Sequence, residues 1–250
     1  MSATVKSADR VLQVFELLTD APDGLLLAEI QRALGLPKSS AHALVSTMAG
    51  RGFIEQDPHS RRYAVGIRLW QAGRSYLTAS SLENLALPYM SQIRADLNET
   101  VQLATLDGTD NVYLAKVDPD HQLRLASHVG ARLPAYATGI GKALLSLLPD
   151  EEIKRRFADT AFTAFTPQTH SSLDDLLAVI RHVRTTGHAE DHGEYTTGVF
   201  CVAMPLKNSP DHRLAALSVS VPEVRKAPDL VDRALESLRR ATTEISQRLS

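Results

Sequence analysis

The sequence contains a single cysteine, Cys201, among its 250 residues. One cysteine excludes an internal disulfide and suits a reducing compartment. No apolar run approaches the roughly 20 residues that a membrane-spanning helix needs. The first ten residues also lack the apolar stretch of a secretory signal. These absences predict a cytoplasmic protein with no membrane partner.

Neither sign of charge dominates the chain, whose net charge of −2 argues against a wholly basic nucleic-acid coat protein. The distribution is uneven, however. Residues 1–80 hold nine Lys and Arg against seven Asp and Glu, so this part is mildly basic and the remainder is acidic. The asymmetry permits DNA binding by the N-terminal part. With 44% hydrophobic and 22% charged residues, the chain can bury ordinary globular cores, and its length suits two domains.

The first 66 residues combine helical periodicity with a hairpin pattern. Apolar spacing predicts three helices, at residues 8–19, 26–34 and 39–52. Gly35 ends the second helix, and Ser39 or Ser40 is expected to cap the third. The segments FIEQ and RYAVG then predict two short strands joined by the polar turn DPHSR. Three short helices followed by a hairpin predict a winged helix-turn-helix domain over residues 1–66.

Residues 67–81 predict a separate linker helix. Its apolar positions include Ile67, Trp70, Tyr76 and Leu77. A helix between two domains needs a cover for such a face, and a symmetric partner chain supplies one, so we expect a homodimer or a dimer of dimers.

Residues 82–250 predict an α/β domain, which makes the whole chain α+β. A helix at 83–97 is expected, with Pro88 near its first turn. Strands are predicted from alternating apolar residues in TVQLATL, NVYLAKVD, QLRLASHVG, VFCVAMPL and LAALSVSVP. Further helices are predicted at 140–148, 150–158, 172–186 and 228–249. Strands interleaved with helices predict a sheet flanked by helices.

Three stretches resemble the IclR family of bacterial transcription regulators. They are residues 27–66, the segment GARLPAYATGIGKALLS at 130–146, and the segment DHGEYTTGVFCVAMPL at 191–206, which LSVSVP follows at 217–222. The combination covers nearly the whole chain. The resemblance implies a winged-helix domain, a linker helix and a GAF-like effector domain. It also implies a ligand-responsive regulator, more often a repressor, that binds a double-stranded DNA operator and a small organic acid.

The third helix is predicted to read DNA, because the first turn of a recognition helix faces base edges in the major groove. The residues predicted to contact DNA at and near the start of this helix are Lys38, Ser39, Ser40, His42 and Ser46, and the hairpin adds His59, Arg61 and Arg62.

Two positions depart from the family pattern. Leu25-Leu26-Leu27 offers no hydroxyl to cap the second helix, which should cost about 1 kcal/mol. Many members carry an arginine after the recognition-helix histidine, where this chain has Ala43. The operator is therefore expected to differ from the family norm.

Effector recognition is predicted around the segment Thr138-Gly139-Ile140-Gly141, which precedes a helix. Free backbone N–H groups at a helix N-terminus bind anions, although these glycines could equally serve only a tight turn. The spacing excludes a Walker phosphate-binding loop. By resemblance to IclR-type sensors of 2-oxo acids, the effector-binding positions are Gly139, Ile140, Asp191, Cys201, Ser218 and Ser220.

The pairing of the last two strands decides whether the polar positions converge. Cys201 would lie opposite Ser218 or Ser220, depending on where the turn is centred, whereas a half-step would place it opposite Val219. An ionised Asp191 would repel a bound carboxylate, so an effector that also presents a hydroxyl or hydrated carbonyl is favoured. Glyoxylate, pyruvate or a short hydroxy acid is the first expectation, and an aromatic acid is the alternative.

Enzyme interpretations are weaker. Cys201 has His188, His192 and His212 nearby in sequence but sits in an apolar strand, where cysteine usually acts as a small hydrophobe. Gly187 and Gly193 would interrupt any helix that could align the acidic and histidine residues of 188–194 as metal ligands. We therefore expect no catalytic residue, no metal and no cofactor. A sensor or enzyme with a non-functional winged helix remains the rival hypothesis.

Overall fold

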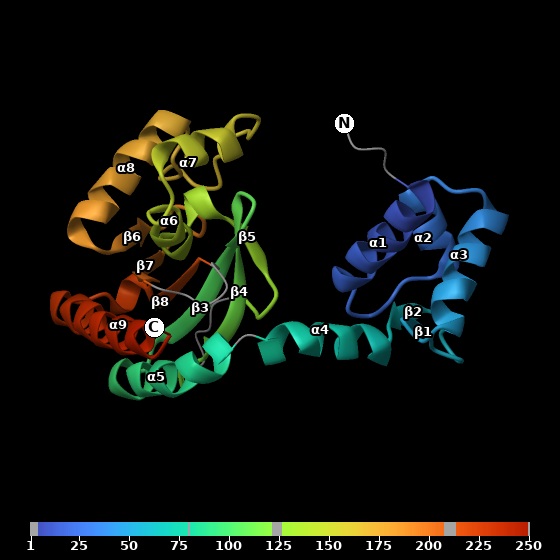
Figure 1. Cartoon of the computed structure of the whole chain (residues 1–250), viewed down its shortest axis with the longest axis horizontal. Helices are drawn as coiled ribbons and strands as arrows, with labels where there is room; N and C mark the ends of the chain where they lie inside the picture. The colour runs from blue at the N-terminus through green and yellow to red at the C-terminus, as the bar shows by residue number, and fades with distance from the viewer. Residues whose placement is uncertain (1–4, 80, 122–126, 208–213, 250) are drawn as a thin grey trace. The chain divides into compact units, whose positions relative to one another are not determined.

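The computed structural model describes residues 5–79, 81–121, 127–207 and 214–249, with the backbone alone described for 74–79 and 81. The chain divides into two compact units, Met1–Ala79 and Ser80–Ser250. Both carry helices and strands (Figure 1). The chain is therefore α+β, as predicted.

The first unit is a winged helix-turn-helix followed by one further helix. Its elements are α1 (Lys6–Thr19), α2 (Leu27–Leu34), α3 (Lys38–Gly50), β1 (Ile54–Gln56), β2 (Tyr63–Val65) and α4 (Ile67–Ala79). The strands β1 and β2 pair antiparallel, with Ile54 opposite Val65. Gly35 ends α2 with a φ of 60°, a left-handed conformation that glycine adopts without steric cost.

A small core holds these elements together. Each helix contributes side chains three or four residues apart, which is the spacing of one helical face. The buried residues are Val14, Leu18, Ile30, Leu34, Val45, Met48, Ile54 and Tyr63. Because this stripe faces inward, the opposite face of α3 is left exposed. In α4, Ile67 is 57% and Trp70 is 56% exposed, while the side chains of Tyr76 and Leu77 lie outside the described residues.

The second unit is built on a six-stranded sheet in the order β5-β4-β3-β8-β7-β6, and every neighbouring pair is antiparallel. Its elements are α5 (Ser81–Leu97), β3 (Thr100–Asp107), β4 (Asp110–Val117), β5 (Arg132–Pro134), η1 (Ala135–Ala137), α6 (Gly139–Leu145), α7 (Asp150–Phe157), α8 (Leu173–Thr186), β6 (Ala189–His192), β7 (Val199–Leu206), β8 (Ala215–Pro222), η3 (Glu223–Arg225) and α9 (Pro228–Arg248).

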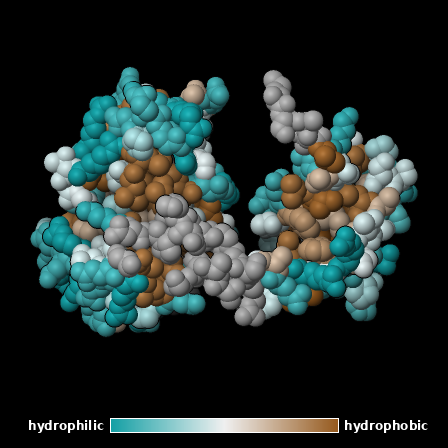
Figure 2. All heavy atoms as spheres, in the orientation of Figure 1, coloured by the Kyte–Doolittle hydropathy of each residue, from teal (hydrophilic) through white to brown (hydrophobic). Residues whose placement is uncertain are grey.

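Helices cover both faces of the sheet (Figure 1). The long helices α5 and α9 lie against one face, where Leu103, Val202 and Leu217 meet Met90 and Leu238 in the larger core. The opposite face carries α6 with α8 and α7 beyond it. In Figure 2 the outer surfaces of this unit are mainly hydrophilic, with hydrophobic side chains in the band between them.

Three predictions need correction. Pro88 lies inside α5, where the buried residues Ala86, Met90 and Ile93 hold the helix in place. The short strands β5 and β6 were not predicted. The strand expected at 122–130 has residues 122–126 outside the described part of the chain, and residues 127–130 form no strand.

Candidate DNA-binding surface and effector site

The exposed face of α3 carries most of the predicted DNA-contacting residues. Ser39, His42 and Ser46 are exposed, while Ala41 and Val45 are completely buried beneath them. The Ser46 hydroxyl lies 3.4 Å from Nδ1 of His42, so these two side chains are neighbours on one helix face. Together they form a short polar row that a groove of DNA could accept.

The start of α3 differs from the sequence prediction. The helix begins at Lys38, and its N-cap residue Pro37 makes no side-chain capping hydrogen bond. The expectation that Ser39 or Ser40 caps the helix was therefore wrong. Because proline fixes the backbone at this corner, the helix starts one residue earlier. Both hydroxyls lie in the first turn and are exposed, as is Lys38.

The hairpin between β1 and β2 is shaped by Asp57. Its Oδ1 atom accepts hydrogen bonds from the backbone N–H groups of His59 and Ser60, at 3.0 and 2.6 Å, and from the Ser60 hydroxyl at 2.8 Å. The hydrogen bonds from Ser60 hold the pKa of Asp57 below its usual value. This turn leaves His59 and Arg61 exposed, with Arg61 at a φ of 60°.

Arg62 is placed differently from the rest of the predicted set. Its guanidinium donates to the Gly24 carbonyl at 2.8 Å and to Oε2 of Glu29 at 3.3 Å. The same Glu29 oxygen accepts the N–H of Leu26, the N-cap residue of α2, at 2.7 Å. The Glu29 carboxylate thus accepts a hydrogen bond from one backbone N–H at the start of α2. The side chains of Leu25, Leu26 and Leu27 have no acceptor atom and cannot do this. The structure thus gives Arg62 an intramolecular contact.

The predicted effector residues meet on the face of the sheet that carries α6. Asp191 on β6 pairs with Cys201 on β7, and Cys201 pairs with Ser220 on β8. Of the two registers that would bring the polar positions together, the structure has the one with Ser220 opposite Cys201. Ser218 precedes Ser220 by two residues on the same strand and pairs with Ala203. Asp191, Cys201, Ser218 and Ser220 are here called the Asp191 cluster.

Gly139, the first residue of α6, sits directly over the Asp191 cluster. A Cβ atom at this position would lie 3.2 Å from Sγ of Cys201 and 3.3 Å from Cβ of Asp191. Ile140 is also buried at the same end of the helix, 1% exposed. All six predicted effector residues therefore belong to one region, formed by α6, β6, β7 and β8.

The backbone N–H groups at the start of α6 are mostly occupied. The Gly141 N–H donates to Oγ1 of Thr138 at 3.0 Å, and the Lys142 N–H donates to the Thr138 carbonyl at 3.0 Å. The Gly139 N–H lies near the Asp191 carboxylate and acts to lower the pKa of that group. The expectation of a set of free N–H groups was therefore wrong for Gly141 and Lys142. Asp191 already supplies an anion at this helix terminus.

Burial dominates the electrostatics of the cluster. Burial raises the pKa of Asp191 to about 6, with a further increase from the charge of Glu194. Burial also raises the pKa of the Cys201 thiol to about 12, and the charge of Asp191 acts in the same direction. A thiol held in its protonated form is a poor nucleophile. His188 and His192 contact Glu190 instead, and His212 lies outside the described residues.

A buried ion pair beside the cluster was missed by the sequence analysis. Lys142 on α6 is 1% exposed, and its ammonium group contacts both carboxylate oxygens of Glu194. Nε2 of His170 lies 3.4 Å from the same carboxylate, and burial lowers the pKa of this imidazole. The two partners of the ion pair are 52 residues apart in the chain, so no local pattern could have indicated it.

Glu194 also connects the cluster to a neighbouring loop. Its backbone N–H donates to Oδ1 of Asp191 at 2.7 Å. Its carbonyl accepts the hydroxyl of Thr169 at 2.6 Å, and the Gly193 carbonyl accepts that of Thr166 at 2.7 Å. The segment after β6 is thus fixed between α6 and residues 166–170.

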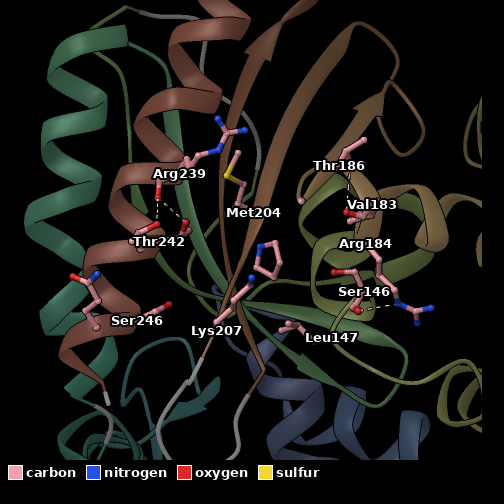
Figure 3. Close-up of a pocket in the computed structure, with 14 residues that line it drawn as sticks. Ser146, Leu147, Val183, Arg184, Thr186, Met204, Lys207, Arg239, Thr242 and Ser246 are labelled. Carbon is pink, nitrogen blue, oxygen red and sulfur yellow. Dashed lines mark hydrogen bonds between the residues drawn. The ribbon is translucent and has the colours of Figure 1, made fainter.

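A separate groove is lined by residues of α8, α9 and the end of β7 (Figure 3). Arg239, Thr242 and Ser246 line it from α9, and Val183 and Arg184 line it from α8. None of the predicted site residues belongs to its lining.

Comparison with known proteins covers both units. A family model described as the IclR helix-turn-helix domain matches residues 7–58, and one described as the C-terminal part of the bacterial transcriptional regulator IclR matches residues 74–247. The chain belongs to the IclR family. The family predicted from the sequence is therefore confirmed, together with the N-terminal helix-turn-helix and the mixed α+β fold.

Relatives within the IclR family are DNA-binding transcription regulators. The chain is 32% identical over 216 residues to the regulator XynR of Escherichia coli K12, covering 86% of each chain. It is 29% identical over 229 residues to the transcriptional repressor IclR of the same organism, covering 91% of this chain and 84% of the relative. Such relatives are regulators rather than enzymes, and several are named repressors.

A solved structure of an IclR homologue from Microbacterium hydrocarbonoxydans superposes with a TM-score of 0.83. It is 25% identical, and the match covers 97% of this chain and 98% of the other. That protein was crystallised with 4-hydroxybenzoate. Within the described part of this chain, no helix has the length and apolar character required to cross a membrane.

Proposed function

We propose that this IclR-family chain is a transcription regulator, acting as a repressor, whose affinity for operator DNA is changed by a small carboxylic acid. Residues 1–66 would bind DNA, residues 67–81 would link and dimerise, and residues 82–250 would bind the effector. The effector would shift the population between arrangements that bind DNA and arrangements that do not.

The exposed polar row of α3 carries the DNA-binding proposal. Ser39, His42 and Ser46 share an exposed face whose opposite side is packed into the core. Lys38 and Ser40 flank the row in the first turn, and Lys38 is suited to a phosphate. His59 and Arg61 would contact the DNA backbone or minor groove from the hairpin. Arg62 would act indirectly, by fixing the hairpin to α2 through Glu29 and Gly24.

A homodimer, or a dimer of such dimers, would form through α4. Ile67 and Trp70 are each more than half exposed on this helix. Large exposed apolar side chains are more often found where a partner covers them. A two-fold pair would also place two recognition helices on successive half-sites of the operator.

The effector proposal rests on the hydroxyl of Ser218. This residue is completely buried, and its Oγ atom makes no hydrogen bond within the described residues. The weakly polar thiol of Cys201 lies close enough to interact with it. Buried polar groups in folded proteins nearly always have a partner, so a bound acid is a natural one. Pyruvate, glyoxylate or a short hydroxy acid offers a carboxylate, together with a carbonyl or hydroxyl group, to the polar side chains of the Asp191 cluster.

An aromatic acid is the second candidate effector. The structural neighbour crystallised with 4-hydroxybenzoate belongs to the same family and has the same fold. Tyr113 adds an aromatic ring to the buried face beside the cluster, where burial raises the pKa of its phenol and keeps it as a hydrogen-bond donor. An aromatic acid could pack against this ring.

The first test is fluorescence anisotropy of the full-length protein on the duplex upstream of its own gene, beside a scrambled duplex. We expect a preference for the native duplex that weakens steeply with salt. At least one of the three acids pyruvate, glyoxylate and 4-hydroxybenzoate should change the affinity of the protein for the native duplex. Turnover of a small molecule with equal, weak binding to both duplexes would support the rival sensor or enzyme instead.

Point variants separate base reading from phosphate contact. His42→Ala should reduce the preference for the native duplex, since a side chain on the exposed row faces base edges. Lys38→Ala should weaken binding to both duplexes by a similar factor. His182→Ala, at an exposed histidine of α8, is the matched control and should leave both affinities unchanged. Unchanged discrimination in His42→Ala would contradict the proposed surface.

A further inference from the structure

Among the described residues, no Lys or Arg side chain forms an ion pair with the carboxylate of Asp191 in the candidate effector site; Lys142 acts on it only as a nearby charge. Asp191 is 7% exposed. Its carboxylate accepts a hydrogen bond from the backbone N–H of Glu194 at 2.7 Å, and the Gly139 N–H lies nearby. Backbone donors stabilise a carboxylate but carry no net charge. The region that would receive an acid therefore already holds one negative charge.

The two lysines on this face of the sheet, buried Lys142 and half-buried Lys116, are paired with other carboxylates. Lys142 contacts both oxygens of Glu194. Lys116, which shares the face through the pairing of β3 with β4, contacts Asp118 at 2.9 Å and donates to the carbonyl of Ser127 at 2.7 Å. The ammonium groups of Lys142 and Lys116 are thus paired with Glu194 and Asp118, and neither forms an ion pair with Asp191.

The remaining titratable groups around Asp191 do not supply a positive charge. Burial lowers the pKa of His170 and raises that of the Cys201 thiol and the Tyr113 phenol, so all three are neutral near pH 7. The groups that act on Asp191 are Lys142 on α6, Glu194 after β6, His170 after α7, Cys201 on β7 and Tyr113 on β4.

A second carboxylate placed beside Asp191 would create two like charges in a poorly solvated site. Two carboxylates in contact cannot both remain ionised, and the pair then shares one proton. We propose that Asp191 takes up one proton from solvent when the site binds a monocarboxylic acid, and that this requirement selects monocarboxylates over dicarboxylates. The inference rests on the proposed effector function.

The proton balance is simple, since no covalent bond other than one O–H forms. The effector enters as a monoanion, one proton leaves the buffer, and an O–H···O hydrogen bond joins the two carboxyl groups. The hydroxyl of Ser218 remains available to the effector's second oxygen. A dicarboxylate would require either a second proton or a further buried negative charge, both of which are unfavourable near neutral pH.

The elevated pKa of Asp191, about 6 in the free protein, fixes the direction of the pH dependence. Binding of the acid raises this pKa further, so the bound state holds the proton at pH 7 while the free state mostly does not. Above pH 6 the affinity should fall about tenfold for each pH unit, following proton linkage. Between pH 5 and 6 the affinity should level off, because Asp191 is then protonated before binding.

The test is isothermal titration calorimetry of the full-length protein with pyruvate at pH 7.5, in phosphate and in Tris. These buffers differ in ionisation enthalpy, so the difference in heat counts the protons taken up. We expect close to one proton per pyruvate in the wild type and none in Asp191→Asn, whose affinity should not depend on pH. Ser218→Ala is the matched control, with weaker binding but the same proton uptake. Malonate should bind the wild type at least tenfold more weakly than pyruvate.

Different failures have different meanings. Pyruvate binding by the wild type without proton uptake would overturn the inference and leave the proposed function intact. Malonate binding as tightly as pyruvate would overturn the selection. Absence of pyruvate binding to both the wild type and Asp191→Asn between pH 5.5 and 8.5 would overturn the inference together with the monocarboxylate effector.

Discussion

The surface of α3 and the Asp191 cluster both contain serine residues, but those of α3 are exposed to solvent and those of the cluster are buried. Ser39 and Ser46 lie on an exposed helix face, whereas Ser218 and Ser220 are buried between sheet and helix. A serine at the surface exchanges one partner for water at little cost. A buried serine without a partner costs roughly 1–3 kcal/mol. In the absence of DNA, the polar groups on α3 can therefore hydrogen-bond to water. The polar groups of the Asp191 cluster must find most of their hydrogen-bond partners within the protein.

The same contrast applies to charge. The ion pair of Arg62 with Glu29 in the first unit is 38% exposed at both side chains. The pair of Lys142 with Glu194 is 1% and 7% exposed. Water screens the first pair and leaves it nearly dispensable, whereas the second pair must stay complete. The buried region should accordingly respond strongly to single substitutions, and the surface region weakly.

The largest effect is expected from Lys142→Met. This change leaves Glu194 buried without its cation and should lower the free energy of unfolding by about 3–5 kcal/mol. The double variant Lys142→Met/Glu194→Gln should recover much of the loss, because the unpaired charge is removed as well. Urea denaturation of the full chain, followed by circular dichroism, measures both.

The matched control is Lys154→Met. Lys154 pairs with Glu151 at a distance of 2.8 Å, but the two side chains are 46% and 84% exposed. We expect a change of less than about 1 kcal/mol. Similar losses in Lys142→Met and Lys154→Met would show that burial is not what distinguishes the two regions.

Packing gives the next effect, through Gly141→Ala. A Cβ atom there would lie 2.3 Å from the carbonyl oxygen of Ala135, which is backbone and cannot move aside. Overpacking of this kind should cost roughly 1–3 kcal/mol. Gly139→Ala meets Cys201 and Asp191 at 3.2 and 3.3 Å, so it should destabilise less while blocking pyruvate binding in calorimetry. Equal stability of Gly141→Ala and the wild type would contradict the tight turn before α6.

The pH dependence of stability should differ in sign between the two regions. The pKa of Asp191 in the folded protein, about 6, exceeds the ordinary value of about 3.8. The folded state therefore binds this proton more tightly than the unfolded state, and stability falls as pH rises from 4 to 6. The wild type should lose about 2 kcal/mol relative to Asp191→Asn across this range, at 1.4 kcal/mol per pKa unit.

Asp57 at the hairpin provides the opposite case. Its pKa is lowered by hydrogen bonds from Ser60, so its contribution is present at neutral pH and is lost as pH falls below the ordinary aspartate value. Urea denaturation at pH 3.0, 4.5, 5.5 and 7.0 compares Asp191→Asn and Asp57→Asn with the wild type, because the Asp57 contribution is lost only below the ordinary aspartate value of 3.8. A wild-type stability that rises relative to Asp191→Asn between pH 4.5 and 7 would contradict the raised pKa of Asp191.

The two regions also differ in how far the sequence could predict them. The recognition helix and hairpin follow from local patterns, because apolar periodicity fixes which face of α3 is exposed. Even here the predicted N-cap, Ser39 or Ser40, was wrong, because α3 begins at Lys38, directly after Pro37. The sequence analysis also did not predict that Glu29 accepts the hydrogen bond of the Leu26 N–H at the start of α2.

The Asp191 cluster depends on contacts between distant segments. The family resemblance pointed to its residues, but the register of β7 against β8 decided whether Cys201 meets Ser220. The strand β6 has the sequence AEDH, whose alternation is too short and too polar to predict a strand. Lys142 lies in an otherwise apolar helix, and its burial is explained by Glu194, which no local pattern connects to it.

The smallest effects, at Arg62 and Arg61, test the surface side of the comparison. Arg62→Met should cost at most about 1 kcal/mol of stability, since its pair with Glu29 is partly solvated. If Arg62 acts through α2 alone, the salt dependence of operator binding should not change. Arg61 is exposed at the hairpin, so Arg61→Met should leave stability unchanged and reduce the slope of log affinity against log salt by about one. Anisotropy titrations at several salt concentrations distinguish the two. A reduced slope in Arg62→Met would mean that this guanidinium leaves Gly24 and Glu29 to reach a phosphate, and the hairpin would then rearrange on DNA.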